Sequence, residues 1–315
     1  MQCFGKTEGF FFATAAASCT TRPLSDRFAI LIIPCESTRS VIRYSTDRTR
    51  SIYEENIMKI IGEAMHILNQ SFVQALENRD TDAVARMARE QVEAGAEALD
   101  VNLGQVRQFG ALTPWLVETV QEAADVSLFL SSHVLSQLRA LEIHKGRATV
   151  NAVTADPDDL RRAMESVGPF QADLVVLLVS SQLTPSDADG RLFLGTQVLD
   201  IAAEVGFPLE RLYLDPVIAC RTDPMTWTLS AGLPDIDTLL TSVQLLGELA
   251  QPRLRILTGL SNASICLPWN QRSAFHCRLL PLLAEAGLDA VIMNCRDRAL
   301  MDRARELAPV QAMAA

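Results

Sequence analysis

Residues 94–104 of this chain read Ala94-Gly95-Ala96-Glu97-Ala98-Leu99-Asp100-Val101-Asn102-Leu103-Gly104, and they contain the unit from which the fold can be predicted. Gly95 follows an amphipathic segment, at a position where helices commonly end in a left-handed residue. The apolar run that starts at Ala98 has the length of a buried strand, and it carries Asp100 and Asn102 at its far end. The stretch therefore predicts a helix end, a short buried strand and a polar strand end.

The same order repeats along the chain from Met58 onward. Eight apolar runs with strand composition alternate with stretches of helical spacing. Asp80 and Asp156-Pro157 mark helix entries, and Gly206 and Gly287 follow helices. We predict strands at Lys59–Gly62, Ala98–Leu103, Val126–Ser131, Ala148–Val153, Leu174–Ser180, Leu212–Asp215, Ile256–Leu260 and Ala290–Asn294. We predict helices at Phe72–Glu77, Thr81–Ala94, Thr113–Ala124, Val134–Leu141, Asp158–Val167, Arg191–Val205, Ile236–Ala250, Ala274–Ala286 and Ala299–Ala308.

Strict alternation of strands and helices predicts a parallel sheet covered by helices, because each crossover between parallel strands needs a long connection. Eight such units predict a closed (β/α)8 TIM barrel. A doubly wound open sheet is the rival architecture, but its first turn is usually rich in glycine. The first turn here reads Gly62-Glu63-Ala64 and has no GxGxxG motif. We therefore predict one barrel domain over residues 58–315.

Residues 1–57 differ in composition from the rest of the chain and are predicted to form an irregular extension. Residues 1–50 hold seven Lys or Arg and four Asp or Glu, whereas the remaining residues hold 21 and 34. A basic segment rich in Ser and Thr has the composition of a transit peptide. Because Met58 stands directly before a clear strand, we favour an upstream extension without its own fold and a natural start at Met58.

The overall composition excludes several classes of protein. No apolar run reaches the roughly 18 residues that span a bilayer, and the net charge of −10 argues against a nucleic-acid partner. Seven cysteines without a CxxC motif fit a reducing compartment, so we expect a cytoplasmic protein. We expect no metal site, because Cys220, Cys266 and His133 have suitable ligand atoms but lack the spacing of a metal motif.

The predicted strand ends carry amides, carboxylates and hydroxyls, with no Lys and no His. In a barrel of this type the active site gathers at the C-terminal ends of the strands. Asn, Asp and Ser also cap helices and begin turns, which accounts for any one of these positions better than for the whole set. The positions are Glu63, Asn102 with Asp100 before it, Ser131, Asn151, Ser180, Asp215, Asn262 and Asn294.

This chemistry suits a neutral planar heterocycle better than a phosphate or a sugar. A carboxylate accepts two hydrogen bonds from a guanidine-like edge, and Asn side chains satisfy alternating donors and acceptors. Pterins have such an edge. We therefore predict a pterin site formed by Glu63, Asp100, Asn102, Ser131, Asn151, Asp215 and Asn294.

Four segments resemble motifs of the methyltetrahydrofolate:corrinoid methyltransferases, in the same order and spacing. They are residues 94–104, Ile60-Ile61-Gly62-Glu63, Leu212-Tyr213-Leu214-Asp215-Pro216 and Gly259-Leu260-Ser261-Asn262. The likeness runs from Met58 to about Asp297, and the wider group includes dihydropteroate synthase and the folate module of cobalamin-dependent methionine synthase. It implies a barrel, usually a homodimer, that binds methyltetrahydrofolate and passes its methyl group to the cobalt of a separate corrinoid protein.

The resemblance also implies roles for single residues. Asp215 would hold the 2-amino and N3 edge of the pterin, Asn151 would contact the ring, and Asn262 would reach N5 as the catalytic residue. Glu63, Asp100 and Asn102 match motif positions that shape the same mouth. One departure stands out, because the family typically ends its third strand in Leu-x-Leu-Asp-Ser whereas residues 128–132 read Leu-Phe-Leu-Ser-Ser. The missing carboxylate at Ser131 implies weaker pterin affinity or a different pterin.

Two alternatives to methyl transfer remain open from the sequence. A dihydropteroate synthase must hold pyrophosphate, and relatives do so with a Lys after strand seven and an Arg-x-His near strand eight. Residues 259–262 offer no Lys, and residues 293–297 lack the His. A catalytically silent pterin-binding subunit is the second alternative, and Ser131 favours it. The sequence leaves the direction of methyl transfer open.

Overall fold

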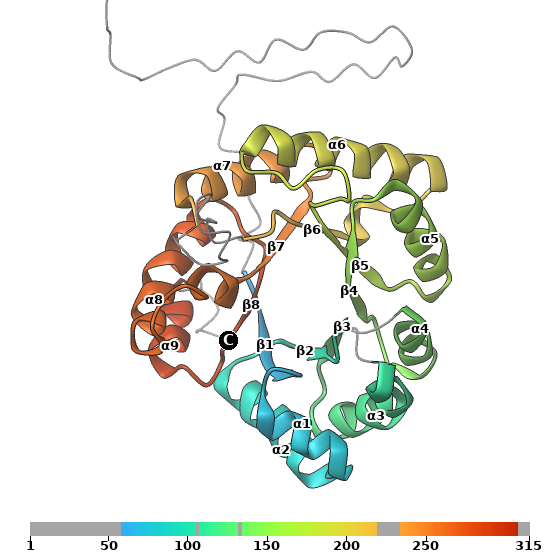
Figure 1. Cartoon of the computed structure of the whole chain (residues 1–315), viewed down its shortest axis with the longest axis vertical. Helices are drawn as coiled ribbons and strands as arrows, with labels where there is room; N and C mark the ends of the chain where they lie inside the picture. Colours follow the sequence, from blue (N-terminus) through green and yellow to red (C-terminus); the bar gives the residue numbers. More distant parts are fainter. Residues whose placement is uncertain (1–57, 105–106, 132–133, 219–233, 308–315) are drawn as a thin grey trace, which may run out of the picture. The chain divides into compact units, whose positions relative to one another are not determined.

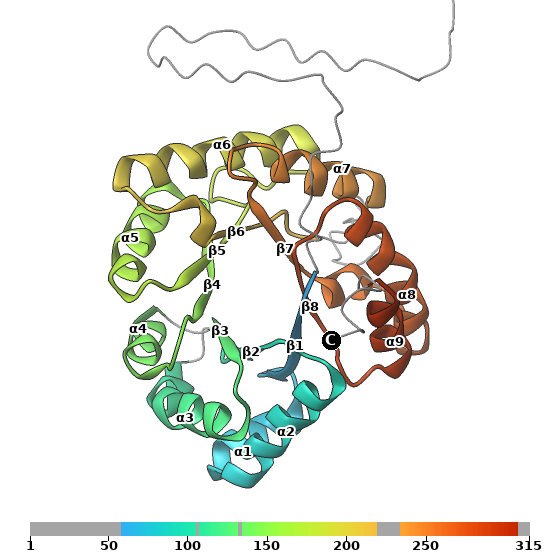
Figure 2. The same ribbon diagram turned by 180° about the vertical axis from the view of Figure 1, so that it is seen from behind.

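Eight parallel strands form a closed barrel in the computed structural model, which describes residues 58–104, 107–131, 134–218 and 234–307. Each strand pairs with its neighbours in the sequence, and β1 (Lys59–His66) pairs with β8 (Ala290–Met293) to close the sheet. The helices surround the strands, as Figures 1 and 2 show from opposite sides. This confirms the predicted (β/α)8 TIM barrel.

The strands between β1 and β8 lie close to their predicted positions. Strand β5 ends at Leu177, three residues before its predicted end, so Ser180 lies in the loop that follows. There the Ser180 hydroxyl accepts a hydrogen bond from the Leu183 backbone N–H at 3.0 Å. The strands are β2 (Ala98–Asn102), β3 (Ser127–Ser131), β4 (Thr149–Thr154), β5 (Asp173–Leu177), β6 (Leu212–Asp215) and β7 (Arg255–Gly259).

The helices begin and end at residues that suit helix ends. Asp80 accepts a hydrogen bond from the Ala83 backbone N–H at 2.9 Å, and Gly95 and Gly206 end helices with φ values of 116° and 69°. Among the described helices, none is long and apolar enough to cross a membrane. They are α1 (Gln70–Asn78), α2 (Thr81–Ala94), α3 (Thr113–Ala123), α4 (Val134–Ile143), α5 (Pro157–Val167), α6 (Ala188–Val205), α7 (Ile236–Gly247), α8 (Trp269–Glu285) and α9 (Arg298–Leu307), with 3-10 turns η1 (Arg107–Leu112), η2 (Gly168–Phe170), η3 (Leu209–Arg211) and η4 (Leu260–Ser264).

Two helices begin earlier than their apolar spacing indicates. Helix α6 begins at Ala188 because the Asp187 carboxylate accepts a hydrogen bond from the Gly190 backbone N–H at 2.9 Å. Helix α8 begins at Trp269, directly after Pro268. Its first turn is largely polar, so the apolar pattern used to place its start becomes visible only after that turn.

Strand β1 runs four residues beyond its predicted end, to His66. The sequence Gly62-Glu63-Ala64 was expected to be a turn, but it forms a bulge, because the register against β2 shifts between Gly62 and Met65. Glu63 therefore lies within the strand and not at its end, which corrects the sequence prediction.

A buried glutamine supports this bulge. Gln91 of α2 is 0% exposed, and its Oε1 accepts a hydrogen bond from the Ala64 backbone N–H at 2.8 Å. Asn69 donates to the carbonyl of the same residue, Ala64, at 2.8 Å. These two side chains satisfy backbone groups that a bulge removes from the sheet ladder. The bulge is therefore part of the fold.

The inside of the barrel is filled with apolar side chains. Alternate residues of the strands point inward and pack in layers, as is usual for this fold. The interior is consequently a packed core without a channel, and binding must take place at one end of the barrel. The inner cluster consists of Ile61, Ala98, Phe129, Val175, Tyr213, Leu257 and Ala290.

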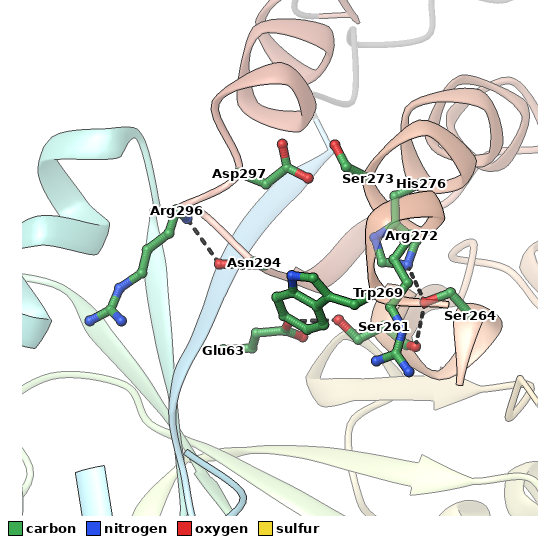
Figure 3. A pocket seen from close by; sticks show the side chains of 10 residues that line it. All are labelled: Glu63, Ser261, Ser264, Trp269, Arg272, Ser273, His276, Asn294, Arg296 and Asp297. Atoms are coloured by element: carbon green, nitrogen blue, oxygen red, sulfur yellow. Dashed lines mark hydrogen bonds between the residues drawn. The ribbon is translucent and has the colours of Figure 1, made fainter. Parts of the chain in front are cut away.

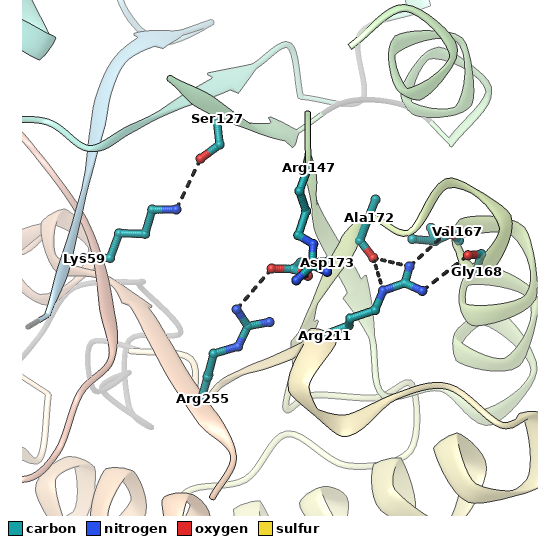
Figure 4. Close-up of polar contacts among 9 residues, drawn as sticks. All are labelled: Lys59, Ser127, Arg147, Val167, Gly168, Ala172, Asp173, Arg211 and Arg255. Atoms are coloured by element: carbon teal, nitrogen blue, oxygen red, sulfur yellow. Dashed lines mark hydrogen bonds and ion pairs between the residues drawn. The ribbon is translucent and has the colours of Figure 1, made fainter. Parts of the chain in front are cut away.

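The N-terminal end of the barrel is closed by polar side chains that pair with one another (Figure 4). Lys59 donates to the Ser127 hydroxyl at 3.2 Å, and Arg255 donates to Asp173 at 3.1 Å. The Arg255 guanidinium also lies 3.8 Å from the centroid of the Tyr213 ring. These contacts form a floor beneath the apolar interior.

The bulge predicts a large effect of a small substitution at Gly62. A Cβ atom there would lie 2.5 Å from Gln91 Oε1, so Gly62→Ala must displace Gln91 and break its bond to Ala64. We expect the free energy of unfolding in urea to fall by about 2–3 kcal/mol. Gly168→Ala is the control, because no atom lies within 4 Å of its Cβ position, and it should be neutral or stabilising by up to about 1 kcal/mol. Equal effects would contradict the role of the bulge.

Candidate functional site at the strand ends

Asp100 lies at the centre of a hydrogen-bond network formed by three adjacent strands. Its Oδ1 atom accepts from the Ser131 hydroxyl of β3 at 2.7 Å and from Asn151 Nδ2 of β4 at 3.2 Å. Its Oδ2 atom accepts from Asn102 Nδ2 of β2 at 3.3 Å. The structure thus brings four of the predicted site residues together around one carboxyl group.

Burial opposes ionisation of this carboxyl group. Asp100 is 2% exposed, and burial raises its pKa above the ordinary value. The hydrogen bonds from the three neighbouring side chains, and to a smaller degree the field of His66, lower the pKa of Asp100. Three donors occupy most of the acceptor sites of the carboxylate. Asp100 is therefore placed to orient the surrounding amides.

The contact between Ser131 and Asp100 offers a physical explanation for Ser131, which stands where the methyltransferase pattern has Asp. Ser131 is 6% exposed, and its hydroxyl donates directly to Asp100. A carboxylate at position 131 would face Asp100 at contact distance, and two carboxylates that close do not both ionise readily. With Ser131 in this position, Asp100 is the one carboxyl group of the Ser131–Asp100 pair.

Asp215 stands at the end of β6, apart from that network. It is 8% exposed, and burial raises its pKa from 3.8 to about 7, while the Val217 N–H and the Arg191 guanidinium lower it. Val217 N donates to Oδ1 at 2.7 Å. Among the described residues no hydrogen bond reaches Oδ2 of Asp215. This oxygen is therefore available to accept a hydrogen bond from a ligand.

A cavity of about 280 Å³ opens at the same end of the barrel (Figure 3). Glu63 and Ser261 line it, and the Ser261 hydroxyl donates to Glu63 Oε1 at 2.6 Å. Burial raises the pKa of Glu63, the Ser261 hydrogen bond lowers it, and the Asp100 carboxylate raises it further. Other lining residues come from α8 and from the segment after β8, and they include Trp269, Arg272, His276, Asn294, Arg296 and Asp297.

A chain of hydrogen bonds fixes η4 against α8. His276 is 5% exposed, and its Nε2 atom lies 2.8 Å from the Ser264 hydroxyl. Ser264 in turn donates to the Ser261 carbonyl at 3.2 Å. Because the Ser264 proton goes to that carbonyl, we assign Nε2 of His276 as the donor. Burial lowers the pKa of His276, which keeps it neutral at pH 7. The chain holds Ser261 in place beside Glu63.

Both arginines that line the cavity are engaged by other groups. Arg272 donates to the backbone carbonyls of Leu267 at 3.1 Å and Ile265 at 3.2 Å. Arg296 donates to Glu90 at 3.3 Å. Neither guanidinium therefore presents its whole donor fork to the cavity.

Asn262 and Asn294 lie at this end of the barrel as well. Asn262 is exposed in η4 and follows Ser261, and its Nδ2 atom would be 3.0 Å from a Cβ atom placed on Gly259. Asn294 follows β8, lines the cavity, and accepts a hydrogen bond from the Arg296 backbone N–H at 3.0 Å (Figure 3). Asn294 therefore lines the cavity with Glu63 and Ser261, whereas Asn262 is not among the residues that line it.

His66 and Ser261 are the residues of this rim that the sequence analysis missed. His66 was not among the strand-end residues selected from the sequence, because β1 continues past the bulge to His66. Burial lowers the pKa of His66, and the Asp100 carboxylate raises it. Ser261 stands inside a motif quoted above, but its contact with Glu63 joins residues 198 positions apart, which spacing does not reveal.

The donor set fits an organic ligand with several N–H groups. In the described part of the chain, no group of three or more His, Cys, Asp or Glu side chains is arranged to hold a metal ion. Cys266 of the ligand set considered above lies between η4 and α8, whereas Cys220 and His133 fall outside the described residues. Carboxyl groups beside amides and hydroxyls suit a planar heterocycle.

The family model of pterin binding enzymes matches residues 65–294. This chain belongs to the pterin binding enzyme family. Among solved structures it is similar to dihydropteroate synthases from Stenotrophomonas maltophilia, Xanthomonas albilineans (in complex with 7,8-dihydropteroate) and Thermus thermophilus, with identities of 15%, 18% and 17%. The alignments cover 83%, 82% and 80% of this chain and 96%, 95% and 94% of those chains, with TM-scores of 0.58, 0.59 and 0.55. These likenesses show the shared barrel fold.

Family membership confirms the coarser part of the sequence prediction, which placed the chain in the pterin-binding barrel superfamily. The strand-end groups are therefore the candidate pterin site of this enzyme. The roles of its individual residues remain predictions.

The raised pKa of Asp215 predicts a stability that depends on pH. The folded protein holds this proton more tightly than the unfolded chain, so ionisation destabilises the fold as pH rises from about 4 to about 7. A pKa that rises from 3.8 to about 7 corresponds to roughly 4 kcal/mol. Asp215→Asn keeps an acceptor for Val217 and removes the charge. Its stability relative to the wild type should therefore increase between about pH 5 and pH 8, as measured by urea unfolding.

Asp156→Asn is the control for this pH series. Hydrogen bonds from Ser181 and then from Thr154 hold the pKa of Asp156 below its ordinary value. Its titration consequently lies below the pH range tested, and its stability difference from the wild type should stay constant there. A constant difference for Asp215→Asn would show that Asp215 ionises normally.

Proposed function

We propose that this chain transfers a methyl group between N5 of methyltetrahydrofolate, or a related tetrahydropterin, and the cobalt of a corrinoid protein. The observation that carries the proposal is the amide and carboxyl rim that ends in Gly259-Leu260-Ser261-Asn262, in a pterin binding enzyme. The engagement of Arg272 and Arg296 by other groups supports it, since methyl transfer needs no pyrophosphate clamp.

Asp215 is the proposed anchor of the pterin. Its buried carboxyl group has one oxygen bonded to the Val217 N–H and one oxygen open to accept from the 2-amino and N3 edge. Asn151 gives its amide N–H to Asp100, which leaves the Asn151 carbonyl oxygen as an acceptor for a ring N–H. Ser131, Asn102 and Asp100 support this arrangement, and Glu63 and Asn294 border the ring on the cavity side.

N5 of the pterin is the leaving group in methyl transfer, and its charge determines how easily the N5–methyl bond breaks. A tertiary amine is a poor leaving group, so the N5–methyl bond becomes labile only as N5 gains positive charge through protonation or strong hydrogen bonding. Asn262, placed in η4 beside Ser261, is the proposed catalytic residue that stabilises this change at N5. The removal of one preorganised interaction of this kind typically lowers a rate by about 10²–10³.

The acceptor is proposed to be a substrate that arrives on a separate corrinoid protein, with Co(I) as the nucleophile. The proposed homodimer and cytoplasmic location rest on the resemblance and on cysteine usage respectively. The division into an extension at residues 1–57 and a pterin-binding barrel at residues 58–315 likewise stays a prediction.

A dihydropteroate synthase-like condensation is the second candidate function. Its support is the barrel likeness to those enzymes and the presence of Arg272 and Arg296 in the cavity lining. To hold pyrophosphate, these arginines would have to leave the Ile265 and Leu267 carbonyls and Glu90. A pterin-binding subunit without catalysis is the remaining alternative.

The decisive experiment follows methyl transfer from methyltetrahydrofolate to reduced cobalamin, free or on a corrinoid protein. We expect the absorption spectrum to change from the Co(I) form to the methyl-Co(III) form. A parallel reaction supplies dihydropterin pyrophosphate and p-aminobenzoate. Condensation without methyl transfer would establish the second candidate, and pterin binding with neither reaction would identify a silent subunit.

Two substitutions should separate binding from catalysis. Asp215→Asn should weaken pterin binding by about 1.5–3 kcal/mol, because it removes a charge-assisted hydrogen bond. Asn262→Ala should slow transfer by about 10²–10³ with a smaller loss of affinity, because its interaction strengthens in the transition state. Calorimetry and single-turnover rates measure the two effects. Asn78→Ala, an exposed amide at the end of α1, should alter neither. Identical behaviour of the two site variants would refute these roles.

A further inference from the structure

Arg191 is a buried arginine of α6 that binds the backbone directly after Asp215. It is 7% exposed. Its Nε atom donates to the Pro216 carbonyl at 2.7 Å, and its Nη2 atom donates to the Val217 carbonyl at 3.5 Å. A side chain 25 residues away in the sequence therefore holds the turn that leaves β6.

The Pro216–Val217 turn, which accepts the Arg191 hydrogen bonds, also donates a hydrogen bond to the Asp215 side chain. Val217 has a φ of 56°, a left-handed conformation that β-branched residues rarely adopt. In that conformation its backbone N–H donates to Asp215 Oδ1 at 2.7 Å. A conformation of this kind persists only where surrounding contacts impose it, and the Arg191 hydrogen bonds to the two carbonyls are such contacts.

The guanidinium of Arg191 is itself fixed on its other side. Its Nη1 atom donates to the Asp187 carbonyl at 3.2 Å and to the Ser242 hydroxyl at 3.4 Å. Ser242 in turn donates to the Thr238 carbonyl of α7 at 2.7 Å. Arg191 therefore joins α6, α7 and the turn after β6, and it has little freedom to move away from that turn.

We propose that Arg191 is a positioning residue for pterin binding, because it fixes the Pro216–Val217 turn so that Asp215 presents its open oxygen to the ligand. This inference rests on the proposed function in one respect, namely that Asp215 binds the pterin edge. Arg191 does not touch the ligand and acts through Asp215.

The charge of Arg191 adds a second, electrostatic effect. Its positive charge lowers the pKa of Asp215 and so opposes the effect of burial. In the described part of the chain, Asp187 and Asp235 are the other carboxylates whose charge acts on Arg191, and together with Asp215 they favour its charged form against burial. Because the ionised carboxylate is the better acceptor, affinity should increase as pH rises through about 7. Loss of Arg191 should move that transition to higher pH.

Arg211 provides a matched control. It is 8% exposed, and it also donates to backbone carbonyls, those of Ala172 at 2.9 Å and Gly168 at 3.3 Å (Figure 4). It precedes β6, whereas the turn held by Arg191 follows β6. Removal of Arg211 therefore costs similar backbone hydrogen bonds at the opposite end of the same strand, far from the proposed ligand.

The test measures tetrahydrofolate affinity by calorimetry across a pH series with the full chain and its variants, together with thermal unfolding. Arg191→Met should bind about tenfold more weakly at pH 7, with its pH transition moved upward, since a neighbouring opposite charge changes ionisation by at least about that factor. Arg191→Lys keeps the charge but cannot bridge both carbonyls. It should keep the wild-type pH transition and still bind more weakly. Arg211→Met should lower the unfolding temperature and leave affinity and pH transition unchanged.

The results separate this inference from the function on which it rests. A wild-type protein that binds no tetrahydrofolate would refute the proposed function. A wild type that binds, with Arg191→Met identical to it in affinity and pH transition, would overturn the inference alone. Full recovery in Arg191→Lys, or an equal loss in Arg211→Met, would also overturn it. If Arg191→Met does not fold, weaker binding by Arg191→Lys with an unchanged pH transition supports the inference.

Discussion

The backbone pairing of β1 with β8 closes the barrel, and the position of the candidate site follows from this closure. Lys59 pairs with Ala290, and the register continues to Gly62 and Met293. Closure brings the C-terminal ends of eight strands to one rim, above an interior filled with apolar side chains. Polar groups on that rim consequently lose much of their contact with water. Burial is the largest influence on the pKa of Glu63, Asp100 and Asp215, and in each case it favours the protonated form.

Asp100 and Asp215 are both buried, but they have different hydrogen-bond partners. We infer different roles for them from this difference. Asp100 receives three side-chain donors and is satisfied by the protein itself. Asp215 receives one backbone donor and keeps an oxygen open in the described part of the chain. A ligand edge rich in N–H groups can therefore donate to Asp215 without displacing a protein hydrogen bond, whereas at Asp100 it would have to displace existing bonds.

The fold could be predicted from the sequence because the pattern of each helix–strand unit is local. Strand β6, for example, was predicted with its observed bounds, Leu212–Asp215. The sequence also indicated that Asp100, Asn102, Ser131 and Asn151 lie together, since polar residues at the ends of parallel strands meet on one rim. It missed the bulge in β1, because the Gln91 side chain that satisfies it comes from a different element. Contacts such as Ser131 with Asp100 depend on strand register, which apolar spacing alone does not give. The same limit hid Arg191, which looked like an ordinary helix residue.

The two ends of the barrel carry different polar groups: charged pairs lie at the N-terminal end, and buried carboxyl groups with amides and hydroxyls lie at the C-terminal end. At the floor, Arg255 is bonded to Asp173 and stacked on Tyr213, although its Nε and Nη2 atoms have no hydrogen-bond partner among the described residues. The floor side chains thus cover the interior at the N-terminal end with groups that already have opposite charges or aromatic faces beside them. At the other end of the barrel, Asp100 and Asp215 are buried among the residues packed around them. Burial in the closed barrel raises the pKa of Glu63, Asp100 and Asp215, and the proposed pterin, which supplies N–H donors, would pair with the open oxygen of Asp215.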